Sequence, residues 1–387
     1  MFHFTALPPL SLYIHFPWCV RKCPYCDFNS HAVHGDIPED QYVDALLADL
    51  ETDLPRVWGR PVRSIFLGGG TPSLFSPEAI ERLLAGVRAR VTLVPEAEVT
   101  LEANPGTVET GRFRGYHAAG VNRLSIGIQS FQPEQLKKLG RIHGRDEALA
   151  AAQAARAAGF DNFNLDLMFG LPQQTIEEAL ADLRTALALQ PTHLSLYQLT
   201  LEPNTLFHAQ PPALPDEDVL AAMQEALQAE LAGAGFAQYE VSAYARAGRR
   251  SRHNLNYWQF GDYLGIGAGA HAKITDAEGV TRLWKVKQPR DYLEKAGTPA
   301  GLGGEQRPGR DDVAFEFMLN ALRLTEGLPA ILFSERTGLD PACMQKPLTQ
   351  AMALGLLEPD LKHIRPTPLG RRFLNDLVEL FLPETTR

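Results

Sequence analysis

Three cysteines, Cys19, Cys23 and Cys26, lie within eight residues near the start of the chain, directly after a strand-like run at 11–16. Cysteine thiolates are the usual protein ligands of iron–sulfur clusters, and three of them leave the fourth iron of a [4Fe-4S] cluster without a protein ligand. A metal site that does chemistry keeps such a position free for a small molecule. The loop therefore predicts a reactive cluster.

Two other interpretations of the cysteine loop remain open from the sequence. One is a zinc site completed by His15 or His31, and the other is a surface loop with three incidental cysteines. Structural zinc sites usually take their ligands from two separated pairs, and no second pair exists here. The fourth cysteine, Cys343, is isolated, as expected of a small packed side chain. So few cysteines argue against disulfides and for a reducing compartment.

The composition limits the class of protein. With 387 residues and 45% hydrophobic content, the chain is long enough for one large domain and an appendage. The net charge of −9 provides no positive field that would attract nucleic acid. The first ten residues lack the basic and apolar segments of an export signal or a membrane span. We therefore expect a cytoplasmic protein with no transmembrane segment and no nucleic-acid partner.

Short apolar runs alternate with amphipathic helical patterns through the first half of the chain. Such alternation is typical of parallel strands covered by helices. It predicts an α/β fold with a partial (βα)6 TIM-like barrel, in which functional groups gather at the carboxyl ends of the strands. The predicted strands are 11–16, 63–67, 98–102, 123–129, 162–168 and 193–199, and the main helices between them are 41–54, 77–90 and 147–158.

Several of these strands end in residues that could contact a ligand. A glycine-rich turn, Gly68-Gly69-Gly70-Thr71, follows the second strand and would let bare backbone approach a ligand. Polar groups buried in apolar strand ends need hydrogen-bonding partners, which a ribose or an amino-acid carboxylate could provide. For each residue a purely structural hydrogen bond is the alternative. The polar residues concerned are Glu102, Gln129 and Asp166, together with Arg141 in the loop after the fourth strand.

The rest of the chain divides by its turn signals. We expect the partial barrel over 1–210, a barrel extension over 211–297, a linker over 298–310 and a small C-terminal domain over 311–387. Within the extension, 236–245 alternates like one strand and 262–271 resembles a glycine-rich turn. The C-terminal pattern predicts a winged-helix-like α+β unit with strands around Leu357 and Ile364. Because this unit carries no basic excess, we expect a lid or docking role instead of DNA binding.

A dense polar and aromatic group, His253-Asn254-Leu255-Asn256-Tyr257-Trp258, lies in the extension. A heme would use both a histidine as axial ligand and flat aromatic surfaces. The alternative is a strand–loop segment whose histidine forms an ordinary hydrogen bond.

The three-cysteine spacing, with Tyr25 before the last cysteine, resembles the radical S-adenosylmethionine (SAM) family. Nearly the whole chain is similar to its HemN/HemW branch, which contains oxygen-independent coproporphyrinogen III oxidases and related heme chaperones. The resemblance implies that Cys19, Cys23 and Cys26 ligate a [4Fe-4S] cluster that SAM completes through its amino and carboxylate groups. It also implies a SAM site lined by Tyr13, Tyr25, Gly69, Gly70, Thr71, Glu102, Gln129, Arg141 and Asp166.

Two positions separate the branches. The oxidases carry a fourth cysteine where this chain has Phe28, whereas the chaperones carry a His-Asn-x-x-Tyr-Trp motif that matches His253, Asn254, Tyr257 and Trp258. The resemblance thus favours a heme chaperone, with His253 as iron ligand or attachment point and the aromatic pair against the macrocycle. The oxidase is the alternative.

The implied partners are heme, an apo-hemoprotein acceptor, for which a membrane respiratory enzyme is one candidate, and an electron donor such as flavodoxin or ferredoxin. The sequence does not decide whether bound SAM is cleaved, so enzymatic activity stays open and no catalytic residue is assigned.

Overall fold

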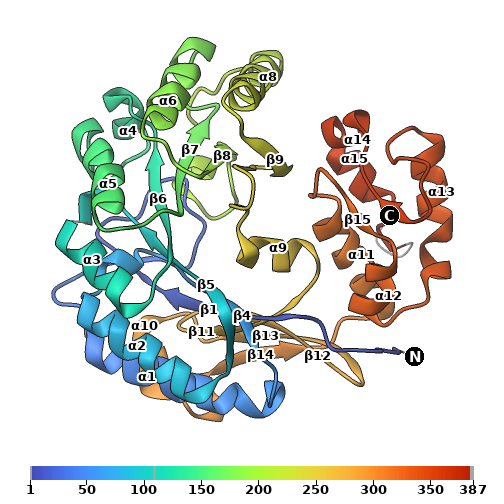
Figure 1. Ribbon diagram of the computed structural model, residues 1–387, viewed down its shortest axis with the longest axis horizontal. Helices are drawn as coiled ribbons and strands as arrows, with labels where there is room; N and C mark the ends of the chain where they lie inside the picture. Colours follow the sequence, from blue (N-terminus) through green and yellow to red (C-terminus); the bar gives the residue numbers. More distant parts are fainter. Residues whose placement is uncertain (1, 108–109, 384–387) are drawn as a thin grey trace.

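The computed structural model of the protein describes residues 2–107 and 110–383. These residues form one curved sheet of 12 strands with helices around its outside, and a separate C-terminal unit lies beside it (Figure 1). Neighbouring strands are parallel from β11 to β8 and antiparallel towards both edges. The strand order is β14 (Leu302–Gln306), β13 (Gly279–Lys285), β12 (His271–Asp276), β11 (Asp262–Ile266), β1 (Leu10–Phe16), β4 (Val62–Gly69), β5 (Leu93–Ala103), β6 (Arg123–Gln129), β7 (Phe163–Phe169), β8 (His193–Gln198), β10 (Ala243–Ala245) and β9 (Ala237–Glu240).

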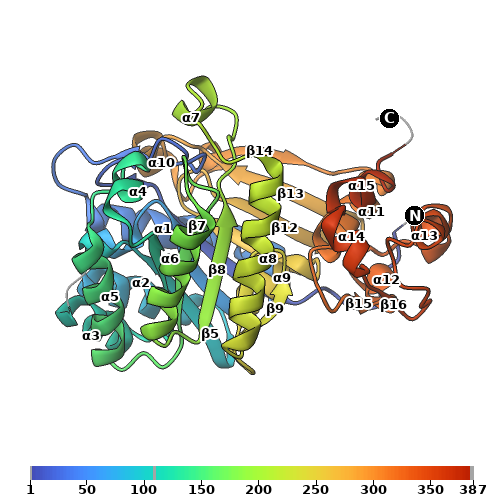
Figure 2. The same cartoon turned by 90° about the horizontal axis from the view of Figure 1, so that it is seen from above.

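The partial (βα)6 barrel predicted from the sequence is confirmed, since β1, β4, β5, β6, β7 and β8 are its six consecutive parallel strands. Helices cover the outer face of this sheet, and Figure 2 shows them side by side in front of the strands. Their termini follow the expected signals; for example, Ser76 caps α2 by accepting a hydrogen bond from the Ala79 amide, and proline occupies the first helical position. The covering helices are α1 (Glu39–Asp53), α2 (Pro77–Arg90), α3 (Thr110–Ala119), α4 (Pro133–Lys138), α5 (Arg145–Ala157), α6 (Ile176–Ala188), α8 (Glu217–Gly233) and α10 (Pro289–Lys295).

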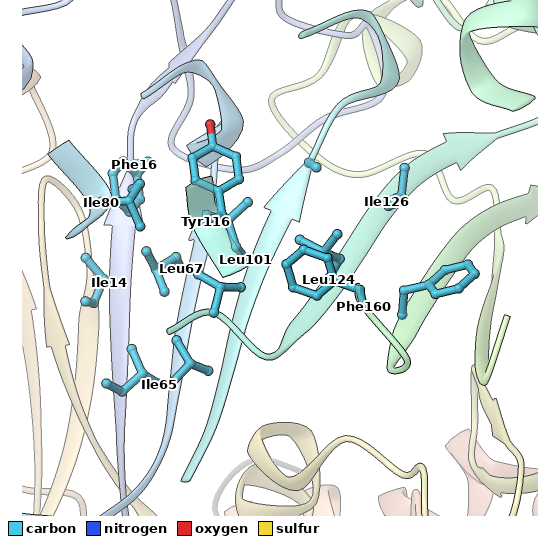
Figure 3. Close-up of a cluster of buried hydrophobic side chains, with 14 of the residues drawn as sticks. Ile14, Phe16, Ile65, Leu67, Ile80, Leu101, Tyr116, Leu124, Ile126 and Phe160 are labelled. Atoms are coloured by element: carbon cyan, nitrogen blue, oxygen red, sulfur yellow. The ribbon is translucent and has the colours of Figure 1, made fainter. Parts of the chain in front are cut away.

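The main core lies between the sheet and this helical layer. Strand residues Ile14, Leu67 and Leu101 are fully buried and share one layer with Ile80 of α2 and Tyr116 of α3 (Figure 3). Burial on both faces explains why the parallel strands read as nearly continuous apolar runs. This core fixes the carboxyl ends of the strands, from which the site is built.

Two segments of the predicted extension were assigned wrongly. Residues 236–245 form two short antiparallel strands, β9 and β10, instead of one strand. Residues 262–271, predicted to be a glycine-rich turn, contain β11, which pairs in parallel with β1 and so adds a strand to the barrel. Only the end of this segment is a turn. Gly267 and Gly269 there have positive φ, and a Cβ on Gly267 would lie 2.4 Å from the His15 carbonyl oxygen.

The same core continues across residue 210, where the sequence predicts a boundary. Met223 and Leu227 of α8 and Leu264 of β11 belong to the cluster that contains the barrel strands. The predicted linker is also partly ordered structure, because β14 occupies 302–306 and pairs with β13 at the sheet edge. The extension and half of the linker are therefore parts of the barrel domain.

The C-terminal unit has its own core, in which Val313, Phe317 and Phe333 are central. The predicted strand around Ile364 is present as β16 (His363–Ile364), paired with β15 (Leu328–Pro329). Leu357 forms only one isolated bridge, so the second predicted strand is wrong. The helices of this unit are α11 (Arg310–Ala321), α12 (Ile331–Thr337), α13 (Gln345–Ala353), α14 (Pro368–Arg372) and α15 (Leu374–Glu379).

Within the described part of the chain, no helix has the length and apolar content that crossing a membrane requires.

Candidate active site

A cavity of about 390 Å³ opens at the carboxyl ends of the parallel strands and extends into the barrel. A volume of this order suits one small-molecule ligand. Its wall brings together most of the residues predicted from the sequence. Those that line it are Cys19, Cys23, Tyr25, Cys26, Gly69, Gly70, Thr71, Glu102, Gln129, Arg141 and Asp166.

The cysteine loop is held against the end of β4 by close backbone contacts. The Gly70 amide donates to the Phe16 carbonyl oxygen at 2.6 Å, and the Thr71 amide donates to the Trp18 carbonyl oxygen at 2.8 Å. A Cβ on Gly70 would lie 2.6 Å from the latter oxygen, which is closer than real Cβ atoms approach. Glycine is therefore required at position 70 for the loop to dock.

Each thiol of the loop lies close to a polar side chain. The Thr71 hydroxyl donates to the Cys19 sulfur at 3.4 Å, and an Arg141 guanidinium nitrogen donates to the Cys23 sulfur at 3.7 Å. The Cys26 sulfur lies 3.8 Å from the Ser30 hydroxyl. Donors of this kind stabilise thiolates that bind iron. Burial raises the pKa of the Cys19 and Cys26 thiols, so binding of iron must release their protons.

The geometry argues against a zinc site. No three His, Cys, Asp or Glu side chains among residues 2–107 and 110–383 converge closely enough to hold a single metal ion. Both ring nitrogens of His15 are already paired, one with the Tyr13 hydroxyl at 2.9 Å and one with the Asn29 carbonyl oxygen at 2.8 Å. Cluster ligands bind different irons and need not converge on one point. The donor set therefore fits a cluster better than zinc.

Two buried carboxyl groups face the interior of the cavity. Glu102 accepts a hydrogen bond from the Gly69 amide at 3.0 Å, and Asp166 accepts from the Ser125 hydroxyl at 2.9 Å and from the Asn164 amide at 2.8 Å. Burial, followed by the neighbouring charge of Asp166, raises the pKa of Glu102 to about 8. Such groups can accept or donate hydrogen bonds to the hydroxyls of a ribose.

The end of β6 is strained where it meets the cavity. Gln129 has a φ of 69°, and the pairing of β6 with β7 shifts register between Gly127 and Gln129. A non-glycine residue in this conformation costs free energy and persists where the surroundings enforce it, often at functional sites. Arg141 contributes to the enforcement, since its guanidinium donates to the Gly127 carbonyl oxygen at 2.6 Å.

Tyr13 does not reach the cavity, in contrast to the prediction. Its ring stacks on Phe66 with centroids 6.4 Å apart, and its hydroxyl pairs with His15. Phe66 lines the cavity in its place. Tyr13 and Phe66 are register partners on β1 and β4, so both point to the same face of the sheet, but only Phe66 contributes to the cavity wall.

The sequence analysis also missed polar residues deeper in the barrel. On β6 the inward face carries Arg123, Ser125, Gly127 and Gln129, all of which line the cavity. These residues are two apart, the period of one strand face, so the pattern was available from the sequence. The same period on β7 adds Asn164 to the predicted Asp166.

The predicted heme motif lies on helix α9 (Arg252–Trp258), which enters the open side of the barrel (Figure 1). The Glu98 carboxylate on β5 anchors the helix by accepting from the backbone amides of Arg252 and His253 at 3.1 and 3.0 Å. Asn254 lines the same cavity as the cysteine loop. Trp258 is half-buried beneath the guanidinium of Arg323, 4.2 Å from its ring centroid.

The structure does not present His253 as a free ligand. The residue is 1% exposed, its Nδ1 lies 2.9 Å from the Ser64 hydroxyl, and its Nε2 lies 3.2 Å from the Tyr257 hydroxyl. Burial, followed by the charge of Arg123, lowers the pKa of His253 to about 3, so the imidazole is neutral. A neutral imidazole can bind iron, but only once the hydrogen bond at the ligating nitrogen has broken and the buried ring has become accessible.

Comparisons with known proteins agree with this geometry. Residues 13–186 match the Radical SAM superfamily and residues 310–373 match the HemN C-terminal domain. The chain is 53% identical over 381 residues to "Heme chaperone HemW" of Escherichia coli K12, covering 98% of this chain and 100% of that protein. The protein of the same name from Haemophilus influenzae is 50% identical, covering 98% and 99%.

A mammalian relative and a solved structure extend the similarity. "Radical S-adenosyl methionine domain-containing protein 1, mitochondrial" of Mus musculus is 38% identical, covering 98% of this chain and 89% of that one. The structure of coproporphyrinogen III oxidase (HemN) from Escherichia coli superposes with a TM-score of 0.81 at 26% identity, covering 97% and 90%.

The partial barrel, its three-cysteine loop and the cavity behind the loop define a radical SAM protein. Within that class the chain belongs to the HemW family. Membership implies a [4Fe-4S] cluster and SAM as cofactors. In radical SAM proteins, once an external donor supplies one electron, this pair supplies cleavage of the sulfonium to methionine and a 5′-deoxyadenosyl radical.

Proposed function

We propose that this protein is a heme chaperone, which binds heme and delivers it to an apo-hemoprotein. The observation that carries the proposal is the identity of 53% across the full length of a relative named for that function, compared with 26% for the structurally similar oxidase. The presence of Phe28 where the oxidases have a fourth cysteine supports the same choice.

The residues of the cavity have separate tasks in this proposal. Cys19, Cys23 and Cys26 hold the cluster, and Arg141 neutralises charge beside Cys23. Gly69 and Gly70 leave space for the methionyl part of SAM, and Glu102 and Asp166 accept from its ribose. Gln129 and Thr71 lie at the rim of this site, and Tyr25 closes it beside the cluster.

We further propose that heme binds to the motif of α9 after the helix has moved away from β4. His253 then provides the iron ligand, and Tyr257 and Trp258 pack against the macrocycle. The helix has only seven residues. Its displacement would break its hydrogen bonds to Glu98 and Ser64 and that of Asn256 to the Asp262 carbonyl oxygen, but no ladder of the sheet, and it would therefore cost less than unfolding a strand.

The finer partners are also proposals. A cytoplasmic location fits the reduced thiols that a cluster requires. The acceptor would be an apo-hemoprotein, with a membrane respiratory enzyme as one candidate, and flavodoxin or ferredoxin would supply electrons if SAM is cleaved.

One experiment distinguishes the chaperone from the oxidase. Cluster-reconstituted protein is prepared anaerobically and titrated with heme, then mixed with an apo-cytochrome, and holo-cytochrome is measured by its Soret spectrum. The same preparation is incubated with coproporphyrinogen III, SAM and reductant, and products are separated by chromatography. The proposal expects stable heme binding and transfer without decarboxylation. Decarboxylation without stable heme binding would support the oxidase instead.

A further inference from the structure

The cavity is lined by a buried arginine whose side chain has no acidic hydrogen-bond or ion-pair partner among the described residues. Arg123, the first residue of β6, is 2% exposed and lines the cavity. Among residues 2–107 and 110–383 its guanidinium has no hydrogen-bond or ion-pair partner, and its Nε is completely buried without one. A buried arginine almost always has an anionic or carbonyl partner, because desolvating an unpaired charge costs several kcal/mol.

The charge of Arg123 acts on its neighbours. After burial, it contributes to lowering the pKa of both His193 and His253. It also favours the ionised form of Asp166, but no hydrogen bond or ion pair joins these two side chains, and Asp166 accepts from Ser125 and Asn164 instead. The guanidinium is therefore free to bind an anion that enters the cavity.

A second unused polar group lines the same cavity from α9. The side-chain amide of Asn254 has no hydrogen-bond partner in the part of the chain that the structure describes. An amide and a guanidinium together offer donors in two directions, which suits an anion with two oxygens.

Arg123 lies far from the end of β6 that is next to the cysteine loop. Arg123 and Gln129 are the first and last of the seven residues of β6, so their backbones lie roughly 20 Å apart at about 3.3 Å per residue. An anion bound by Arg123 is therefore not one that ligates the iron beside Cys23. One uncompensated positive charge matches a carboxylate, whereas a phosphate would leave excess negative charge near the buried Asp166.

We propose that Arg123 and Asn254 form a second binding subsite, on the floor of the barrel cavity, for the carboxylate of a small molecule. It goes beyond the chaperone proposal, since it needs neither heme transfer nor a role for His253. The carboxylate could belong to a free acid or to a heme propionate. The subsite would hold the far end of a ligand while the cysteine loop holds the near end.

The test compares Arg123→Met with Arg290→Met in cluster-reconstituted protein under anaerobic conditions. Arg290 is a matched control, because its side chain is 90% exposed. The probes are sodium propionate against propionamide, which lacks the carboxylate, and heme against heme dimethyl ester. Binding of each probe is followed by the shift in the thermal unfolding midpoint and by titration.

We expect Arg123→Met to be as stable as the wild type or more stable without a probe, because it removes an unpaired buried charge. At least one carboxylate probe should bind roughly tenfold or more weakly to Arg123→Met than to Arg290→Met. The ester or carboxylate-free partner of that probe should bind equally to both, and the probe affected identifies the source of the carboxylate.

Two results would overturn the proposal. One is that no probe distinguishes the two variants. The other is that Arg123→Met lowers the unfolding midpoint of the protein without a probe, which would make Arg123 a structural cation. Neither result bears on heme transfer, which is measured separately, so this subsite and the chaperone function can fail independently.

Discussion

The imidazole of His253 lies against the ring of Phe66, with the two ring centroids 5.1 Å apart. Phe66 also lines the cavity behind the cysteine loop. A single aromatic side chain thus connects the histidine of the predicted heme motif to the cavity proposed for SAM. If heme binds at His253 as proposed, movement of α9 away from β4 would expose Phe66, and heme binding would then be coupled to the filling of the cavity.

Replacing Tyr257 with phenylalanine should strengthen heme binding if His253 is the iron ligand. The Tyr257 hydroxyl lies 3.2 Å from Nε2 of His253, and this hydrogen bond must break before that nitrogen can bind iron. Removing it lowers the cost of opening by about 1 kcal/mol, which corresponds to roughly fivefold tighter binding. Heme titration followed by the Soret band measures the change.

Tyr263→Phe is the matched control, because its ring packs 4.5 Å from that of Tyr257 while its hydroxyl bonds to Arg282. It should leave the heme affinity unchanged. Equal or weaker binding by Tyr257→Phe would argue against Nε2 of His253 as the ligand.

Thr71→Val should lower the reduction potential of the cluster without removing iron. The hydroxyl donates to the Cys19 sulfur at 3.4 Å, and such a bond stabilises the reduced, more negative cluster. Losing ~1 kcal/mol of this preference shifts a one-electron potential by about 40 mV in the negative direction. Electron paramagnetic resonance during a redox titration measures the potential, and iron analysis checks the loading.

Thr100→Val provides the control for the loss of a buried hydroxyl. Thr100 is fully buried, and its oxygen has no partner among the described residues. Its replacement should leave the potential where it is. A potential of Thr71→Val that matches the wild type would mean that the Thr71 hydroxyl does not act on the cluster.

Glu102→Gln should change how stability depends on pH. Burial, followed by Asp166, raises the pKa of Glu102 from 4.5 to about 8. Between these values the folded protein holds a proton that the unfolded chain has released, so the free energy of unfolding falls as pH rises through this window. Glutamine cannot titrate and therefore does not show the decline.

As the pH rises from about 5 to about 8.5, the variant should gain about 4 kcal/mol of stability relative to the wild type, at about 1.4 kcal/mol per pKa unit. Urea unfolding of both proteins without SAM, at several pH values, measures the difference. A constant difference across this range would show that Glu102 is ionised throughout and that its pKa is not raised.

The sequence was most informative where a residue type has few roles. The spacing of Cys19, Cys23 and Cys26 and the polar strand ends were sufficient to place most of the cavity wall, because parallel strands bring their carboxyl ends to one edge. The long periodic helix α2 also has the predicted bounds. In such segments local propensity and tertiary burial favour the same structure.

The predictions from the sequence failed where contacts between distant segments of the chain determine the structure. The five-residue strand β11 contains Gly265, is followed directly by Gly267, and was predicted to be part of a turn, yet pairing with β1 makes it an inner strand of the sheet. The burial of His253 depends on Ser64, 189 positions away in the sequence, so no local pattern could predict it. Arg123 was overlooked because its partner-free state is visible only when the surrounding side chains are placed.

The last prediction concerns the contact that docks the cysteine loop. A Cβ on Gly70 would lie 2.6 and 2.7 Å from the carbonyl oxygens of Trp18 and Phe16, which are backbone atoms and cannot rotate away. Gly70→Ala should therefore destabilise the protein by about 2 kcal/mol and lower its bound iron, since the loop must shift.

The control is Gly111→Ala in α3, where a Cβ meets nothing within 4 Å, and it should be neutral or stabilising. Urea unfolding and iron analysis of the two variants measure both effects. If Gly70→Ala retained its iron and its stability, the cysteine loop would not depend on the close approach of β4, and the three thiols would have to be positioned by their own loop alone.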